Sequence, residues 1–292
     1  VVGHIANVKN FAKLEIAEGT SKIKFAVGGL AGMVETTGAT IQESCNYGDI
    51  SVLNEGDPQA KTCTIGGITG KFDREGSIIN CENHGNIINS HMGVNGIGGI
   101  VANTNARPEN ITPLIKGTDN YGSITLNNSV TDVFAGGIVG RFCGAIIEDC
   151  ENNGAFNMVS SDVKLYYGGI AGRFVNDFKD ADGNFILKKE SKIINCKNNS
   201  TALFNYKGNP PRAGNDLRIG GMFNTEGGGA SALTLSGCYN YASYTITHPK
   251  IRCLGGIVGG AAAKTMPVTI TGEINPNIVI INAVINIPLC LK

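Results

Sequence analysis

The sequence predicts an all-β protein, a parallel β-solenoid (β-helix) built from about seven glycine-anchored repeats. A double glycine recurs at intervals of 32 to 52 residues, and β-branched runs ending in a C-x-N-x-G pattern follow it. No segment shows the period of an amphipathic helix of three turns. Without helices to cover long crossovers, parallel strands need coils that stack directly on one another.

The seven double glycines open the pattern G-G-[ILM]-x-[GAN]. They are Gly28-Gly29, Gly66-Gly67, Gly98-Gly99, Gly136-Gly137, Gly168-Gly169, Gly220-Gly221 and Gly255-Gly256. Two residues without side chains let a neighbouring backbone pass closely or let the chain turn a corner. We expect three short strands per coil and a rod about 34 Å long, at about 4.8 Å per coil. A β-propeller, whose blades need four antiparallel strands, is the alternative.

One domain is expected over the whole chain, residues 1–292. Residues 1–24 are expected to form a partial first coil or cap, 25–265 the repeats, and 266–292 a C-terminal coil or cap. The sequence opens on Val1 with neither Met nor a leader, which is typical of a processed or excised piece. The apolar stretch from Ile278 to Leu291 is broken by Asn and Pro, so it is too short and too polar for a membrane helix.

Two structural ladders follow from the repeat. One consists of asparagines at equivalent positions, Asn46, Asn83, Asn120, Asn152, Asn198 and Asn240. Their amides can bond from coil to coil, and Asn also tolerates left-handed turns. The other consists of Cys81, Cys150, Cys196 and Cys238, with Cys45 one residue out of register. The odd total of nine cysteines, and the single cysteine that a coil contributes to this column, favour buried thiols. Disulfides are the alternative, and without a C-x-x-C pair zinc is disfavoured.

The composition argues against nucleic acid and membranes as partners. Lys plus Arg and Asp plus Glu both number 24, so the formal net charge is zero, and both partners reward a basic excess. Charged residues make up only 16% of the chain, which leaves Asn, Ser and Thr to supply surface polarity.

The stretch from Gly136 to Gly154, "GGIVGRFCGAIIEDCENNG", resembles the GLUG-type glycine-rich repeat. Related phrases start at Gly66 and Gly168, whereas the third and seventh units match weakly. The resemblance implies a β-solenoid of a secreted or surface-exposed bacterial protein, as in large adhesins. It supplies no catalytic residues.

The motifs that could carry chemistry are weak. "NDFKDADGNF", from Asn176 to Phe185, places Phe178 and Lys189 at two ligand positions of an EF-type loop, so a turn is favoured over calcium and no metal or cofactor is expected. Carboxylates such as Glu82 and Glu151 could line up between coils as in glycan-cleaving enzymes, but solvated turn residues are the simpler interpretation. The chain is therefore expected not to be an enzyme.

Tyrosines near the turns and one long insertion are the best indications of binding. Tyrosines along an edge can stack on sugars or contact proteins, or they can cap the core. The candidate binding residues are Tyr206, Lys207, Arg212, Tyr239 and Tyr241. We expect an extracellular or cell-surface bacterial module that adheres to a glycan or protein, with a spacer or filament subunit stacked end to end as the alternative. A polysaccharide-active enzyme is the third possibility.

Overall fold

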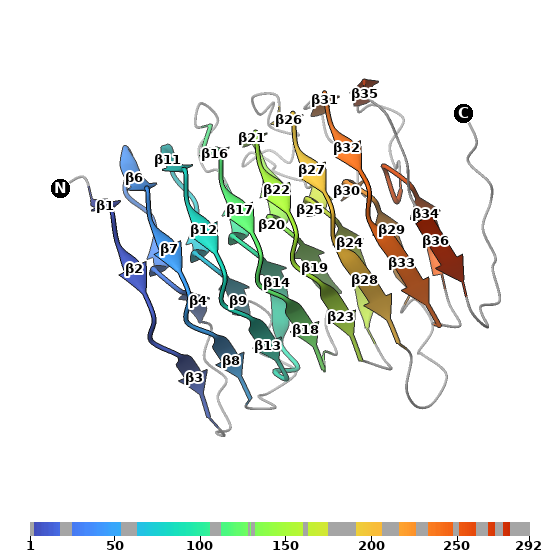
Figure 1. The fold of residues 1–292 in the computed structure, drawn as a ribbon, viewed down its shortest axis with the longest axis horizontal. Coiled ribbons are helices and arrows are strands. Elements are labelled where there is room, and N and C mark those ends of the chain that lie inside the picture. The colour runs from blue at the N-terminus through green and yellow to red at the C-terminus, as the bar shows by residue number, and fades with distance from the viewer. Residues whose placement is uncertain are drawn as a thin grey trace, which may run out of the picture.

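The structure is a computed structural model of the chain. It describes residues 3–17, 25–53, 63–105, 112–127, 129, 132–159, 163–174, 191–205, 216–225, 233–247, 251–260, 268–271 and 277–280. These residues form strands and turns without any helix, so none of them forms a helix that could cross a membrane. Equivalent strands of successive coils lie side by side along the long axis of the molecule (Figure 1).

Five parallel sheets, named A to E here, collect the equivalent strands. Sheet A comprises β1 (His4–Ala6), β6 (Ala39–Gln42), β11 (Gly76–Ile79), β16 (Leu114–Lys116), β21 (Ile146–Glu148), β26 (Ser191–Ile194), β31 (Leu233–Ser236) and β35 (Val268–Thr271). Sheet B comprises β2 (Lys9–Asn10), β7 (Cys45–Asn46), β12 (Glu82–Asn83), β17 (Asp119–Asn120), β22 (Glu151–Asn152), β27 (Lys197–Asn198) and β32 (Tyr239–Asn240). Sheet C comprises β3 (Leu14–Ile16), β8 (Ile50–Val52), β13 (Ile87–Asn89), β18 (Ile124–Leu126), β23 (Phe156–Met158), β28 (Thr201–Phe204), β33 (Ser243–Ile246) and β36 (Asn277–Ile280).

The other two sheets flank the double glycines. Sheet D precedes them and comprises β4 (Ala26–Gly28), β9 (Cys63–Gly66), β14 (Val94–Gly98), β19 (Asp132–Gly136), β24 (Lys164–Gly168), β29 (Leu217–Gly220) and β34 (Ile251–Gly255). Sheet E follows them and comprises β5 (Ala31–Val34), β10 (Thr69–Phe72), β15 (Val101–Asn105), β20 (Val139–Cys143), β25 (Ala171–Phe174) and β30 (Phe223–Thr225).

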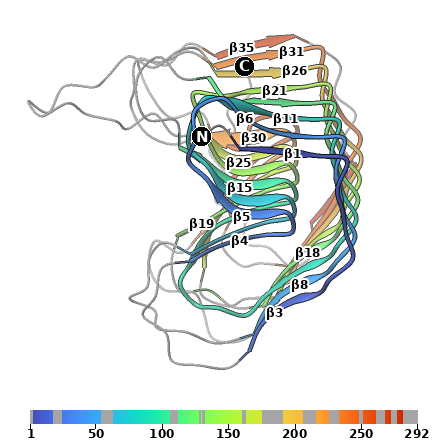
Figure 2. The same cartoon turned by 90° about the vertical axis from the view of Figure 1, so that its left-hand side faces the viewer.

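The fold confirms the predicted β-solenoid but not the predicted coil. A complete coil has five strands, in the order D, E, A, B, C, rather than three. Sheets A, B and C run around the outside, whereas D and E form an arm folded into the interior (Figure 2). The arm divides the interior into two hydrophobic cores. One contains Ile78 and Phe72 from sheets A and E, and the other contains Ile87 and Ile65 from sheets C and D.

The double glycines form the tip of the arm, which lies against the inner side of sheet B. A Cβ on Gly67 would overlap the Asn83 side chain and the Gly99 carbonyl oxygen of the next coil. Close approach to a side chain and to a stacked backbone therefore requires glycine here. Glycine is required at position 85 for the same reason, because a Cβ there would overlap the Gly48 carbonyl oxygen of the preceding coil.

The predicted asparagine ladder is confirmed and is one member longer. Each Nδ2 donates to the Oδ1 of the next coil, at 2.9 Å from Asn46 to Asn83, 2.9 Å from Asn83 to Asn120 and 3.0 Å from Asn120 to Asn152. The series continues through Asn198 to Asn240. Asn10 adds the first member, 2.9 Å from Asn46. The ladder satisfies polar groups where the arm meets sheet B.

The left-handed residues lie elsewhere than expected. The non-glycine members occupy the corner between sheets A and B, with φ of 51° at Glu43, 51° at Asn80, 53° at Asp149 and 52° at Asn195. The ladder asparagines, three residues later, sit in extended strands. In these coils one left-handed residue per corner thus redirects the chain before the ladder begins.

The cysteine column lies just after this corner. Cys81, Cys150, Cys196 and Cys238 are buried, and each thiol donates to the carbonyl two residues earlier, at 3.4, 3.2, 3.2 and 3.3 Å. Ser44 and Thr118 make the corresponding hydroxyl contacts in other coils, whereas Cys45 faces outward. Burial raises the pKa of Cys81 to about 11 and the pKa of Cys196 well above its usual value. The hydrogen bond with Cys196 instead lowers the pKa of Cys238. Cys81 and Cys196 are therefore small packing groups rather than nucleophiles.

His91 is a fully buried histidine between sheets C and D. Its Nδ1 accepts the backbone N–H of Gly93 at 3.0 Å, so the ring proton resides on Nε2. Among the described residues Nε2 has no hydrogen-bond partner, and the Phe25 ring lies 5.1 Å away at 85°. Burial lowers the pKa of His91 because it disfavours the imidazolium.

We predict an acid-side loss of stability from His91. In the unfolded chain His91 takes up a proton near pH 6.5, whereas the buried ring of the folded chain stays neutral. The free energy of unfolding therefore has its full value above that pH and falls below it, by at most about 1.4 kcal/mol per pH unit. His91→Asn keeps an acceptor for Gly93 but cannot titrate. Urea unfolding at about pH 7.5 and about pH 5 should show a larger loss in the wild type than in the variant. Equal losses would contradict this role.

Candidate binding face on sheet B

The outer side of sheet B is the candidate functional site. In each two-residue strand the asparagine points inward, so the residues before and after it face outward. The first outward column is Lys9, Cys45, Glu82, Asp119, Glu151, Lys197 and Tyr239. The second is Phe11, Tyr47, His84, Tyr121, Asn153, Asn199 and Tyr241. The repeat therefore places like positions in register on a rigid surface.

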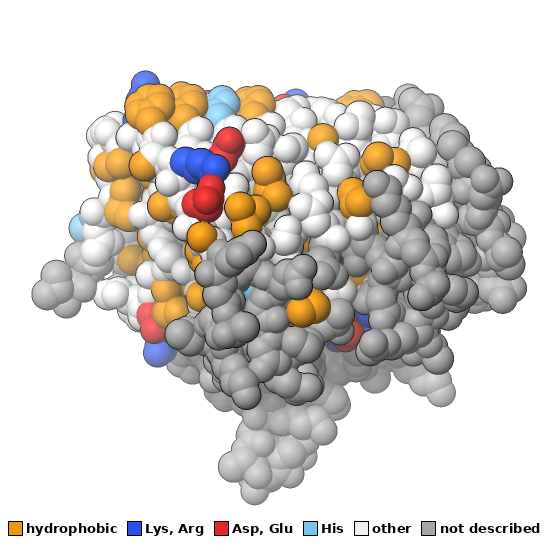
Figure 3. Space-filling view, turned by 90° about the horizontal axis from the view of Figure 1, so that it is seen from below, with side chains coloured by type: hydrophobic (Ala, Val, Ile, Leu, Met, Phe, Trp, Pro, Cys, Tyr) orange, Lys and Arg blue, Asp and Glu red, His pale blue; other side chains and the backbone are white. Residues whose placement is uncertain are grey.

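An aromatic ladder occupies the second column in its first four coils. The Phe11 and Tyr47 ring centroids are 5.0 Å apart, Tyr47 and His84 4.7 Å, and His84 and Tyr121 4.8 Å, with interplanar angles of 7°, 9° and 7°. Phe11 is 70% exposed and Tyr121 44%. A row of hydrophobic side chains interrupted by a histidine is visible along the upper edge of Figure 3. Since the inner rings cover each other's faces, they offer mainly edges and hydroxyl groups to solvent.

A carboxylate column runs beside the ladder. Glu82 and Asp119 are register partners, and Glu151 stands on the next coil. Glu82 Oε2 lies 2.8 Å from His84 Nε2, Asp119 Oδ1 accepts the Glu151 N–H at 2.8 Å, and Lys197 Nζ lies 2.6 Å from Glu151. The predicted alignment of Glu82 with Glu151 thus needs correction, because Asp119 stands between them.

The carboxylates create a negative potential along this face. Burial raises the pKa of Asp119, and the charges of Glu151 and Glu82 raise it further, against the opposing effects of the Glu151 N–H hydrogen bond and of Lys197. Burial also raises the pKa of Tyr121, and the carboxylates of Asp119, Glu82 and Glu151 add to the effect. Ligands that carry positive charge or donate hydrogen bonds match such a surface.

The sequence-predicted binding residues fall in two groups. Tyr239 and Tyr241 lie on the same face at its C-terminal end, with rings 6.0 Å apart at an interplanar angle of 2°, and Tyr241 is 50% exposed. Tyr206, Lys207 and Arg212 lie outside the described residues, as does the stretch from Asn176 to Phe185. Asn153 and Asn199, joined by a 2.9 Å hydrogen bond, separate the tyrosine pair from the aromatic ladder.

The other tyrosines belong to the interior. Tyr166, Tyr167 and Tyr244 are almost fully buried. Arg218 Nη1 donates to the Tyr166 hydroxyl at 2.8 Å, and Asn198 Nδ2 donates to the Tyr244 hydroxyl at 3.1 Å. The interpretation as core residues therefore holds for these three, whereas Tyr47, Tyr121 and Tyr241 are surface residues.

Sequence reasoning missed Phe11 and Asn10. "KNFAKLEI", from Lys9 to Ile16, forms the strands equivalent to those of "CNYGDISV", from Cys45 to Val52, one coil earlier. Val8 stands at the cysteine position of the C-x-N-x-G pattern and Ala12 at its glycine position, so a search for that pattern passes over this coil. The aromatic residue after the asparagine was the available signal.

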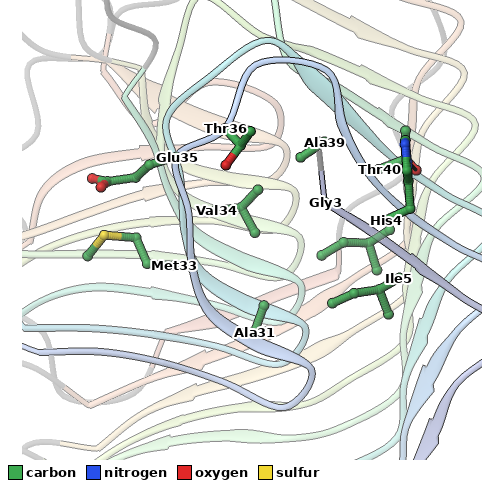
Figure 4. A pocket seen from close by; sticks show the side chains of 11 residues that line it. Gly3, His4, Ile5, Ala31, Met33, Val34, Glu35, Thr36, Ala39 and Thr40 are labelled. Carbon is green, nitrogen blue, oxygen red and sulfur yellow. Dashed lines mark hydrogen bonds between the residues drawn. The ribbon is translucent and has the colours of Figure 1, made fainter. Parts of the chain in front are cut away.

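One hollow of about 230 Å³ lies at the N-terminal end, between β1, β5 and β6. Ile5, Ala31, Val34 and Ile41 supply its apolar lining, and Glu35 is its one carboxylate (Figure 4). It opens where the core between sheets A and E is uncovered. The carboxylate column is on the open face of sheet B instead, so the hollow and the acidic residues do not combine into one site.

Comparisons with protein-family models, curated proteins and solved structures found no match to this chain. The likeness to the GLUG-type repeat accordingly stays a resemblance carried by the residue pattern alone.

Proposed function

We propose that the chain is a noncatalytic extracellular β-solenoid module of a bacterial surface or secreted protein, and that it adheres to protein ligands through the outer face of sheet B. The aromatic ladder carries the proposal. Exposed apolar side chains in contiguous array are typical of interaction sites, and Tyr is enriched at protein interfaces. The GLUG-like pattern favours an extracellular setting.

The stacking favours a protein over a glycan as the ligand. A sugar ring packs against an aromatic face, and the faces of Tyr47 and His84 are covered by their neighbours at 4.7–5.0 Å. Ring edges, hydroxyl groups and adjacent carboxylates remain, and these suit the polar and apolar groups of a polypeptide. No step of catalysis is proposed, because Glu82, Asp119 and Glu151 do not line the hollow at the N-terminal end.

The test is adhesion of a ladder variant. Tyr47→Ala combined with Tyr121→Ala should reduce binding to purified extracellular-matrix proteins at least about tenfold, since central aromatic residues dominate interface energies. Leu53→Ala, which truncates a side chain that is 40% exposed elsewhere, is the matched control and should bind normally. Binding unchanged in the ladder variant, or binding confined to a glycan array, would refute the proposal.

A spacer or filament subunit is the second candidate, and the N-terminal end favours it. The edges of β1 to β5 are uncovered among the described residues, with Val8 43% and Met33 49% exposed. Uncovered parallel edges are templates for further strands. Sedimentation velocity over a concentration series should then show linear growth that Met33→Lys abolishes. A monomer at every concentration would exclude this function.

A further inference from the structure

We infer that the face of sheet B takes a basic polypeptide segment in polyproline II conformation, lying along the solenoid axis. The inference rests on the proposed function and names the class of its ligand. Its premises are the sign of the charge on the face, the spacing of the carboxylates and the orientation of the rings.

The charge is local and negative. Glu82, Asp119 and Glu151 occupy three successive coils, and Glu43 and Asp49 flank them on neighbouring columns. In the described part of the chain, no Lys or Arg forms an ion pair with Glu82 or Asp119, whereas Lys197 contacts Glu151 at the end of the row. Basic side chains therefore complement the middle of the face.

The spacing selects the ligand conformation. Coils repeat at about 4.8 Å, so Glu82 and Glu151 are about 10 Å apart along the axis. A polyproline II helix rises about 3.1 Å per residue and has three residues per turn, so side chains three apart share a side and are separated by about 9 Å. In an extended strand, residues two apart share a side at about 6.7 Å and fit neither one coil nor two.

The aromatic ladder supplies the second half of the contact. Its rings present edges and the hydroxyl groups of Tyr47 and Tyr121 beside the carboxylate column. Polyproline II ligands dock on aromatic surfaces, and they lose little entropy because the helix is formed beforehand. Lys or Arg at every third position can then reach Glu82 and Glu151 while the intervening residues lie on the ladder.

Fluorescence anisotropy with labelled peptides tests the inference. About five repeats of Pro-Pro-Lys should bind the whole chain, whereas Pro-Pro-Glu repeats and a peptide of equal composition with lysines at alternate positions should not. Glu82→Gln combined with Asp119→Asn should weaken binding about tenfold. Glu15→Gln combined with Glu35→Gln removes the same charge elsewhere and should leave binding unchanged.

The outcomes separate this inference from the proposed function. If the chain binds no Pro-Pro-Lys peptide but loses matrix adhesion in the Tyr47 and Tyr121 variant, the inference fails and the proposed function stands. If adhesion is also insensitive to the ladder, both fail. Equal weakening by the two charge variants would mean nonspecific attraction, and preferential binding of glucosamine oligomers would replace the peptide by a cationic glycan. Either result overturns the inference.

Discussion

Gly137→Ala is expected to abolish folding or to lower the free energy of unfolding by at least about 4 kcal/mol. The new Cβ would overlap the Asn152 side chain and the Gly169 carbonyl oxygen of the next coil. The first is held by the ladder and the second by the stack, so neither can move without breaking buried hydrogen bonds. Chemical unfolding followed by circular dichroism measures the loss.

Gly96→Ala is the matched control, because Gly96 lies in sheet D of the preceding coil, three residues before the second glycine of its own pair. Its Cβ would meet Ala102 O at 3.1 Å and Thr64 Cγ2 at 3.4 Å, which small shifts can accommodate. We expect a loss below about 1.5 kcal/mol. Similar losses in both variants would show that the arm does not press against sheet B as described.

Asn120→Ala should lower the free energy of unfolding by about 3 kcal/mol. Asn120 Nδ2 donates to Gly122 O and to Asn152 Oδ1, both at 3.0 Å, and its Oδ1 accepts from Asn83 at 2.9 Å. Truncation leaves buried partners unsatisfied on both sides. Asn10→Ala removes an end member near the solvent and should cost under about 1 kcal/mol. Equal costs would contradict a cooperative buried ladder.

Asn120→Asp tests the same hydrogen bonds through the pH dependence of the free energy of unfolding. The carboxylate would place an acceptor against the oxygens of Gly122 and Asn152, so the folded state should raise the pKa of this Asp above the usual value of about 3.9. A raised folded pKa means that stability falls as the pH rises. Relative to the wild type, the variant should therefore be weakest at neutral pH and recover toward pH 4, whereas a pH-independent difference would contradict the hydrogen-bond assignment.

The repeat made the solenoid and the ladder predictable, but not the path of each coil. The strands of sheet B have two residues each, which is too short for an alternation of polar and apolar residues to be recognised in the sequence. The sequence does not predict the arm, because a double glycine is equally consistent with a corner beside one strand, whereas Gly66-Gly67 joins two strands. Gly67 lies against the Asn83 side chain because the coil folds back on itself, and this packing joins segments that no local pattern in the sequence connects.

Part of the candidate site can likewise be predicted from the repeat. Tyr47, Tyr121 and Tyr241 follow ladder asparagines, so alternation along a strand places them outside once Asn is known to point inward. Buried Tyr244 differs only by lying on an inward position of sheet C, which tyrosine content alone does not reveal. The insertion with Tyr206, Lys207 and Arg212 breaks the repeat, and the repeat logic does not extend to it.

Side-chain amide exchange tests the central account, a stack of coils held by a buried asparagine ladder, most directly. Selective ¹⁵N labelling of asparagine permits NMR detection of each Nδ2 group after transfer to D₂O. Signals of Asn83, Asn120, Asn152 and Asn198 should persist for hours, as for groups released only by global opening, while Asn10 exchanges early. Loss of all the side-chain signals within minutes would show that these amides are open to water and that no buried asparagine ladder holds the coils together.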